Sequence, residues 1–135
     1  MLLLSILEAA IVDLQRIGGE HMAAAVRYLD KEVLVRAELM KCASAGETPS
    51  YREFGARVGI PPQGPWKPVL DKISREQTRQ GLPDITFLLI NKNTGYPGQI
   101  GFLRARKPTP EQKGLARLKL QEVFEAFCPT ARLPF

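Results

Sequence analysis

Apolar residues recur at helical spacing through the first 45 residues, a segment that contains no proline. Two adjacent glycines, Gly18 and Gly19, divide this segment, because tandem glycine costs a helix roughly 2 kcal/mol against alanine. The pattern predicts two amphipathic helices, the second from about residue 22 to residue 42, paired as a hairpin over 1–45. Their apolar stripes are Leu3, Leu7, Ile11 and Leu14 in the first helix, and Val26, Leu29, Val33, Ala37 and Met40 in the second.

Most of the prolines lie between residues 49 and 110, which predicts short elements separated by turns. Ser50 followed by Glu53 has the form of a capping box, so we expect a short helix that ends at Gly59. From Trp66, apolar residues recur at i, i+3, i+4 and i+7 and predict a further helix that ends near Arg79. These two helices and the turn between them predict a helix-turn-helix.

The hydrophobic pattern changes after Pro83. Residues 85–90 are apolar almost throughout and rich in β-branched and aromatic side chains, which is typical of a buried strand. A loop rich in turn residues follows over 91–98, and residues 99–103 can form a returning strand. The segment 85–103 is therefore predicted to be a β-hairpin.

A last helix is predicted to begin at Thr109. Pro110 occupies the first helical position and Gln112 the capping-box position, and Pro129 marks the end. The expected apolar face consists of Leu115, Leu118, Leu120, Val123, Phe124 and Phe127.

This order of elements predicts a mainly helical α+β fold in which a helix-turn-helix is followed by a β-hairpin wing. At 135 residues the chain is long enough for a single domain. Its expected parts are a helical hairpin over 1–45, a basic winged-helix unit over 50–107 and a C-terminal helix over 109–128.

Turn and capping residues between Ser50 and about Phe127 follow the order of motifs in a known domain. They are Tyr51 to Pro61, Leu82-Pro83, Ile90-Asn91, the glycines Gly95, Gly98 and Gly101, and Glu111 to Leu120. This part of the chain resembles the C-terminal domain of the O6-alkylguanine-DNA alkyltransferases and alkyltransferase-like proteins, which implies a DNA-binding winged-helix scaffold. The family's acceptor motif, Pro-Cys-His-Arg, is missing because Asp84 follows Pro83, so no alkyl transfer is implied.

The net charge of +5 is concentrated in one segment. Ten basic and four acidic residues between residues 50 and 107 give this segment a charge of +6, which leaves the rest of the chain at −1. Localised positive charge suits contact with phosphates, because each neutralised phosphate releases counterions and strengthens binding at low salt.

Three basic residues, Lys72, Arg75 and Arg79, share a face of the predicted fourth helix away from its apolar side. This placement suits a recognition helix in a major groove, although a solvated face that Asp71 and Glu76 partly neutralise is an alternative. The charges near the hairpin also allow two interpretations, wing contacts with DNA or solubilising charge at a strand edge. The predicted DNA-binding residues are Lys67, Lys72, Arg75 and Arg79 on the helix, and Lys92, Arg104, Arg106 and Lys107 in or after the wing.

Few residues are suited to catalysis or metal binding. The two cysteines, Cys42 and Cys128, exclude a disulfide scaffold and a cysteine-based zinc site, and we expect both to be free thiols. His21 has no matching ligand spacing elsewhere. The sequence therefore predicts no enzyme activity, no cofactor and no metal.

The first seven residues resemble the apolar part of a signal peptide, but no basic residue precedes them and Glu8 interrupts the run. We therefore expect a cytoplasmic protein without a membrane partner. The leading hypothesis is a small, non-enzymatic protein that binds duplex DNA, with the role of a regulator. The alternative is a phage- or plasmid-type interaction module whose basic face docks on an acidic protein. The wide apolar faces of the N-terminal helices would also allow a homodimer.

Overall fold

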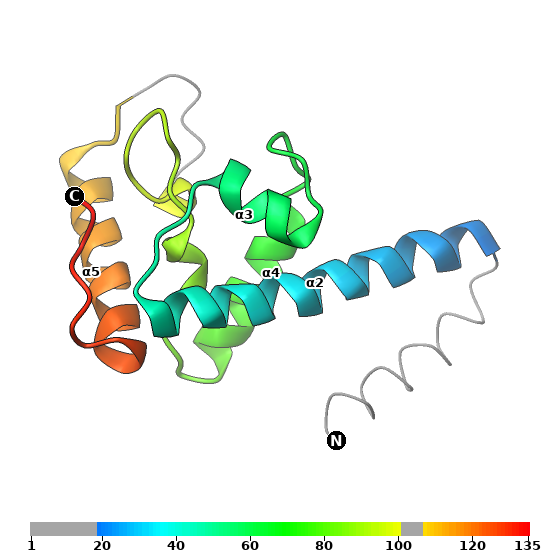
Figure 1. The fold of residues 1–135 in the computed structure, drawn as a ribbon, viewed down its shortest axis with the longest axis horizontal. Coiled ribbons are helices and arrows are strands. Elements are labelled where there is room, and N and C mark those ends of the chain that lie inside the picture. The colour runs from blue at the N-terminus through cyan, green and yellow to red at the C-terminus, as the bar shows by residue number, and fades with distance from the viewer. Residues whose placement is uncertain (1–18, 101–106) are drawn as a thin grey trace.

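The computed structural model describes residues 19–100 and 107–135, and the side chains of residues 31–100 and 107–135 (Figure 1). The predicted first helix of the N-terminal hairpin lies outside these residues. The elements in chain order are α2 (Gly19–Ala45), α3 (Tyr51–Val58), α4 (Lys67–Arg79), the short 3-10 helices η1 (Ile85–Leu88) and η2 (Gly98–Ile100), and α5 (Pro110–Phe127).

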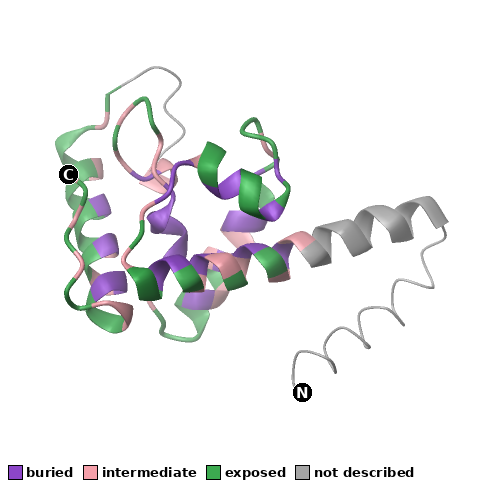
Figure 2. Cartoon of the chain, viewed as in Figure 1, coloured by how far each residue is buried: buried purple, intermediate pink, exposed green. Residues whose placement is uncertain are grey.

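The centre of the structure is η1, the apolar segment that follows α4. It contacts α2, α4, α5 and η2. Its residues Ile85 and Leu88 and the following Leu89 are fully buried, as the apolar run predicts. Figure 2 shows that the buried residues of α2, α4 and α5 gather on the sides that face this centre.

The backbone of this buried segment is satisfied locally rather than by a sheet. The Asp84 carboxylate caps η1 by accepting from the Thr86 N–H at 3.1 Å, and its other oxygen accepts from the Ser74 hydroxyl. The Phe87 N–H then donates to the Asp84 carbonyl at 3.3 Å, the i to i+3 bond of a 3-10 turn. Because these bonds are local, the apolar segment is buried with no strand beside it among residues 19–100 and 107–135.

The predicted β-hairpin over 85–103 is wrong, and so is the α+β winged-helix class that depends on it. The regular elements formed by the described residues are all helices, and no strand occurs among these residues. Two isolated bridges join Ile90 to Ser50 and to Pro97. After Ile90 the chain turns on itself, since the Gly95 N–H donates to the Asn91 carbonyl at 2.8 Å. Beyond Pro97 it enters η2, and the last residues of the predicted second strand lie outside the described part.

The predicted helix-turn-helix is not formed by α3 and α4. An eight-residue connection over 59–66 separates them, longer than the three- or four-residue turn of that motif. α3 contacts α2, whereas α4 contacts α2 and η1, and α3 and α4, both wholly described, do not pack along each other. Trp66 links them instead, with its ring centroid 5.3 Å from that of Tyr51 and 6.1 Å from that of Phe54.

The helix ends follow their local sequence. Ser50 caps α3 by accepting from the Glu53 N–H at 3.2 Å, and Gly59 ends it in the left-handed region with φ of 72°. Lys31 of α2 completes this end, because its ammonium donates to the carbonyls of Val58 and Gly59 at 2.8 and 2.9 Å. α5 begins with the full predicted capping box of Thr109 and Gln112.

The buried faces of α2 and α5 differ from the predicted stripes. On α2, Ala37 is exposed, whereas Val35, Leu39, Cys42 and Ala43 are buried. On α5, Leu115 and Leu118 are 41% and 54% exposed. The residues of α5 that enter the core are Ala116, Leu120, Val123 and Phe124.

The chain beyond α5 runs back beside that helix (Figure 1). Ala131, Leu133 and Phe135 pack against the core. This segment also closes against the end of α2, because a Cβ at Gly46 would come 2.8 Å from Cβ of Ala131. The C-terminal residues are therefore part of the packed structure.

Tyr51 shows how tightly the cluster around Trp66 is packed. Burial raises the pKa of its phenol to about 12, so the hydroxyl stays protonated in ordinary buffers. A Cβ at Gly98 would collide with the same ring and hydroxyl. Position 98 can therefore hold only a glycine beside the Tyr51 ring.

Two glycine substitutions test this packing in opposite directions. Gly55→Ala should destabilise the protein by about 2 kcal/mol, because a new Cβ would collide with the Ile60 carbonyl and lie 3.1 Å from Cζ2 of Trp66. Gly114→Ala should stabilise it by about 1 kcal/mol, because that helical site has no atom within 4 Å of a new Cβ. Urea denaturation of both variants measures the difference, and equal effects would contradict the packing described.

Candidate nucleic-acid interface

The outward face of α4 carries the basic residues that the sequence points to most clearly. The opposite face of the helix is fixed against the core by Val69, Leu70, Ile73 and Gln77, which are all buried. Arg75 and Arg79 are consequently exposed one helical turn apart, about 6 Å along the axis. Neither has a hydrogen-bond or ion-pair partner in the described part of the chain.

Lys67 extends this face toward the start of α4. It is the first residue of the helix and is exposed. Lys67, Asp71 and Arg75 are spaced four residues apart, so they lie along one face of the helix. Asp71 is half-buried and contributes a negative charge within this row. We call the row formed by Lys67, Asp71, Arg75 and Arg79 the α4 face.

Lys72 lies toward α2 rather than on the α4 face. Its ammonium forms an ion pair at 3.0 Å with Glu32 of α2, whose carboxylate is almost completely buried. A second ion pair joins Arg36 of α2 to Glu76 of α4, and Arg36 also donates to the Gln77 side-chain oxygen at 3.3 Å. These contacts form a polar seam between the two helices, so the charge of Lys72 is matched inside the protein.

The seam also explains which face of α2 is buried. The predicted apolar stripe of α2 runs through Val33, Ala37 and Met40, whereas the residues that have partners on α4 are Glu32 and Arg36. The helix is therefore rotated relative to the predicted orientation. This rotation could not be read from α2 alone, since its cause lies on another helix.

The predicted wing residues are divided between described and undescribed parts of the chain. Lys92 is exposed in the turn after Asn91, and Lys107 is exposed shortly before α5. Arg104 and Arg106 lie outside the described residues. Without a β-hairpin, Lys92 and Lys107 are carried by loops and not by a wing.

Sequence reasoning missed a second basic area, on α5. Lys113 lies over the Tyr96 ring, 5.5 Å from its centroid, and Arg117 lies over the Phe135 ring at 5.9 Å. The two rings stack on each other with their centroids 4.6 Å apart. The i, i+4 spacing of the two cations was visible in the sequence, but their aromatic partners come from distant segments.

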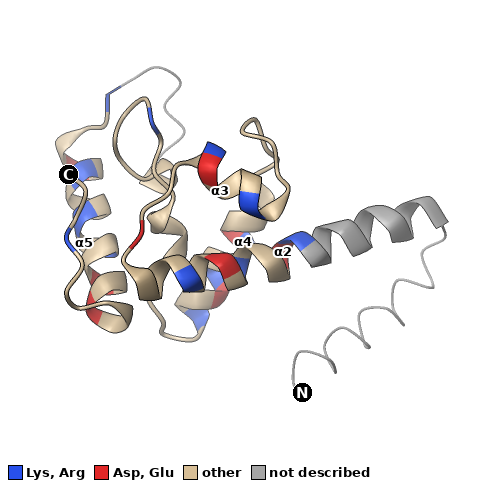
Figure 3. Ribbon diagram, in the orientation of Figure 1, with Lys and Arg blue, Asp and Glu red and all other residues tan. Residues whose placement is uncertain are grey.

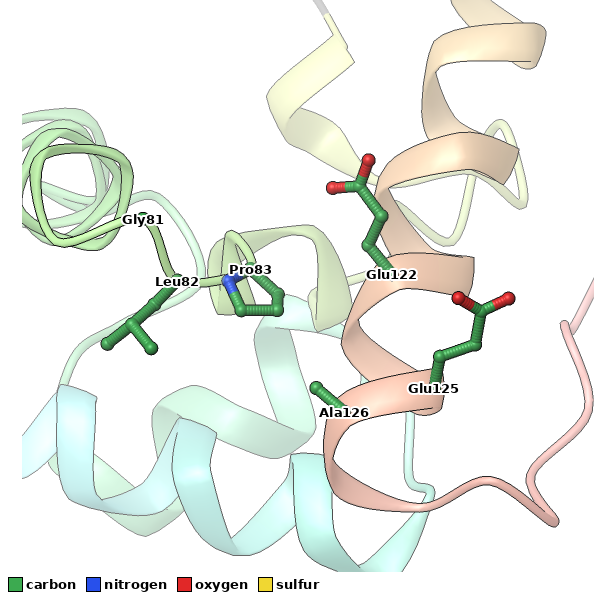
Figure 4. A pocket seen from close by; sticks show the side chains of 6 residues that line it. All are labelled: Gly81, Leu82, Pro83, Glu122, Glu125 and Ala126. Carbon is green, nitrogen blue, oxygen red and sulfur yellow. The ribbon is translucent and has the colours of Figure 1, made fainter.

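Acidic residues occupy the end of the same helix. Glu122 and Glu125 line an open pocket together with Ala126 and the segment Gly81–Pro83, which directly follows α4 (Figure 4). Figure 3 shows that basic positions lie on the early turns of α5 and acidic positions on its last turns.

The described residues offer little for metal or thiol chemistry. No group of three or more His, Cys, Asp or Glu side chains among them is arranged to hold a metal ion. Burial raises the pKa of the Cys42 thiol, although the nearby Arg57 guanidinium opposes the shift, so the thiol stays protonated. Both cysteines are free.

None of the helices in the described ranges is long and apolar enough to cross a membrane. No protein-family model matches the chain, and searches of curated proteins and of solved structures return no match.

The structure predicts different roles for Lys72 and Arg75. Lys72→Ala should destabilise the protein by about 1–2 kcal/mol, because it leaves the Glu32 carboxylate buried without its cation. Arg75→Ala should change stability by less than about 0.5 kcal/mol, because the side chain is exposed and has no partner among the described residues. Urea denaturation of each variant measures the two effects.

Adding Glu32→Gln to the Lys72→Ala variant provides the control. The double variant should recover part of the lost stability, because it removes the unpaired charge. If Lys72→Ala cost no more stability than Arg75→Ala, the assignment of Lys72 to the seam would be wrong.

Proposed function

We propose that the protein is a non-enzymatic, cytoplasmic duplex DNA-binding protein whose α4 face contacts the phosphate backbone. The observation that carries the proposal is the exposure of Arg75 and Arg79 on a helix whose opposite side is fixed in the core. Their guanidinium groups can donate to phosphate oxygens without first breaking an ion pair in the described part of the protein.

The rigid support of α4 strengthens this proposal. Arg36 and Lys72 hold the helix against α2 through the polar seam, and Gln77 holds it to the following segment by donating to the Pro83 carbonyl at 2.9 Å. Positions on a packed helix lose little freedom on binding, so less of the binding energy is spent on ordering them. The remaining basic groups can then act together on one phosphate backbone.

The observed face suits backbone contact more directly than base reading. Arginines one turn apart can each neutralise a phosphate, and the exposed Lys67 adds a third charge at the start of the helix. Asp71 lies between these cations and would be repelled by a phosphate, which limits how closely the middle of α4 can approach. Binding should therefore be strongly dependent on salt.

The test is fluorescence anisotropy with a duplex of about 25 base pairs, measured at several salt concentrations. Replacing Arg75 and Arg79 together by Ala should lower affinity by about tenfold or more at low salt. It should also reduce the slope of log affinity against log salt by about 2, because two phosphate contacts are lost.

The matched control removes the same charge from another surface. Lys41→Ala with Arg52→Ala takes two exposed cations from α2 and α3, away from the α4 face. This control variant should retain most of the affinity for the duplex and most of the slope of log affinity against log salt. An unchanged slope in the Arg75 and Arg79 variant, or equal losses in both variants, would contradict the proposal. Absence of duplex binding at low salt would instead favour docking of the basic face on an acidic protein partner.

A further inference from the structure

The early turns of α5, the loop at residues 91–96 and the C-terminal segment form a second basic surface. Lys113 and Arg117 project from one flank of α5 and rest on the stacked rings of Tyr96 and Phe135. We call this surface the α5 flank. The exposed basic residues on the adjoining segments are Lys92, Lys107 and Arg132.

The positive charges of Lys113 and Arg117 are not neutralised by their aromatic partners. An aromatic ring holds a cation in place but, unlike a carboxylate, does not neutralise it. Lys92, Lys107 and Arg132 have no ion-pair or hydrogen-bond partner within the described ranges. Glu111, in the first turn of α5, contributes a negative charge at the start of this helix.

The aromatic rings indicate which form of nucleic acid this surface suits. Proteins that bind single strands stack bases on open aromatic faces. Here Tyr96 and Phe135 already have each other and a cation as neighbours. The surface therefore offers positive charge without a stacking platform, which favours the backbone of a duplex.

The α5 flank is separated from the α4 face. The segment Gly81–Pro83 leaves the end of α4 and lines a pocket with Glu122 and Glu125, so two carboxylates lie beside the path from α4 to α5 (Figure 4). A duplex that passed over both basic surfaces would bring its phosphates close to these carboxylates, at an electrostatic cost.

We infer that the α5 flank is a second, independent binding surface for the phosphate backbone of duplex DNA, so that one chain holds two duplex segments. This inference rests on the proposed function of the α4 face. It assigns Lys113 and Arg117 as binding residues and gives the Tyr96–Phe135 stack the role of positioning them.

A capture experiment tests the inference with the full chain. One duplex is attached to beads, and a fluorescent duplex of the same length is added with the protein at low salt. The wild-type protein should retain the fluorescent duplex on the beads. The triple variant K92Q/K107Q/R132Q should lower capture by about fivefold or more while still binding one duplex through the α4 face.

A second variant tests the aromatic-supported cations directly. K113Q/R117Q should lower capture in the same way, and its melting temperature shows whether the lost ring contacts affect folding. The triple variant should fold as the wild type does, because its three side chains have no hydrogen-bond or ion-pair partner in the described structure. R75A/R79A should also lose capture, since either surface alone binds only one duplex.

The outcomes separate this inference from the function on which it rests. If the wild type binds no duplex, the proposed function fails and this inference fails with it. If it binds one duplex in a manner that depends on Arg75 and Arg79 but captures no second, only the inference is wrong. A third outcome is capture that both α5-flank variants retain and R75A/R79A loses. This result would indicate a dimer that bridges two duplexes through two α4 faces, and it would also overturn the inference.

Discussion

Burial of the segment from Ile85 to Leu89 is the constraint on which the rest of the structure depends. Its side chains fill the space between α2, α4 and α5, and these helices pack around it. Burial of backbone groups is tolerated only where their hydrogen bonds are made. The carboxylate of Asp84, with donors from Ser74 and Thr86, starts a 3-10 turn that makes some of these bonds within the segment, and the Leu89 carbonyl accepts from the Gly98 N–H at 3.2 Å.

This central segment determines which surfaces remain available for binding. α4 presents its apolar side to η1 and its polar flank to α2, which leaves Arg75 and Arg79 outside. α5 covers another side of η1 and receives the stacked rings of Tyr96 and Phe135 along its flank. The positive charge that the sequence concentrates over 50–107 is thus partly used inside the protein, as at Lys72, and partly exposed.

Local features of the sequence were good predictors, because their causes are local. The caps at Ser50 and Thr109 and the stop at Gly59 are formed by neighbouring residues, and α3, α4 and α5 lie where the pattern predicts. The apolar run at 85–90 predicts a strand that the structure does not form, because periodicity alone cannot distinguish a buried strand from another buried segment. The cap at Asp84 starts a 3-10 turn there, and no residue in the described ranges forms a strand beside it.

Contacts between distant segments account for the features that the sequence did not predict. The rotation of α2 depends on pairs between Glu32 and Lys72 and between Arg36 and Glu76, forty positions apart in the chain. The α5 flank depends likewise on rings from two other segments. The exposed arginines of α4 could be predicted, because the apolar stripe on the same helix fixes the opposite side.

The most direct test of the α4 face as a DNA-binding surface is an amide chemical-shift titration of the isotope-labelled full chain with duplex DNA. At low salt the largest chemical-shift changes should fall on α4 around Lys67, Arg75 and Arg79, and added salt should reverse them. Changes absent from α4, or changes that persist at high salt, would contradict DNA binding by the α4 face.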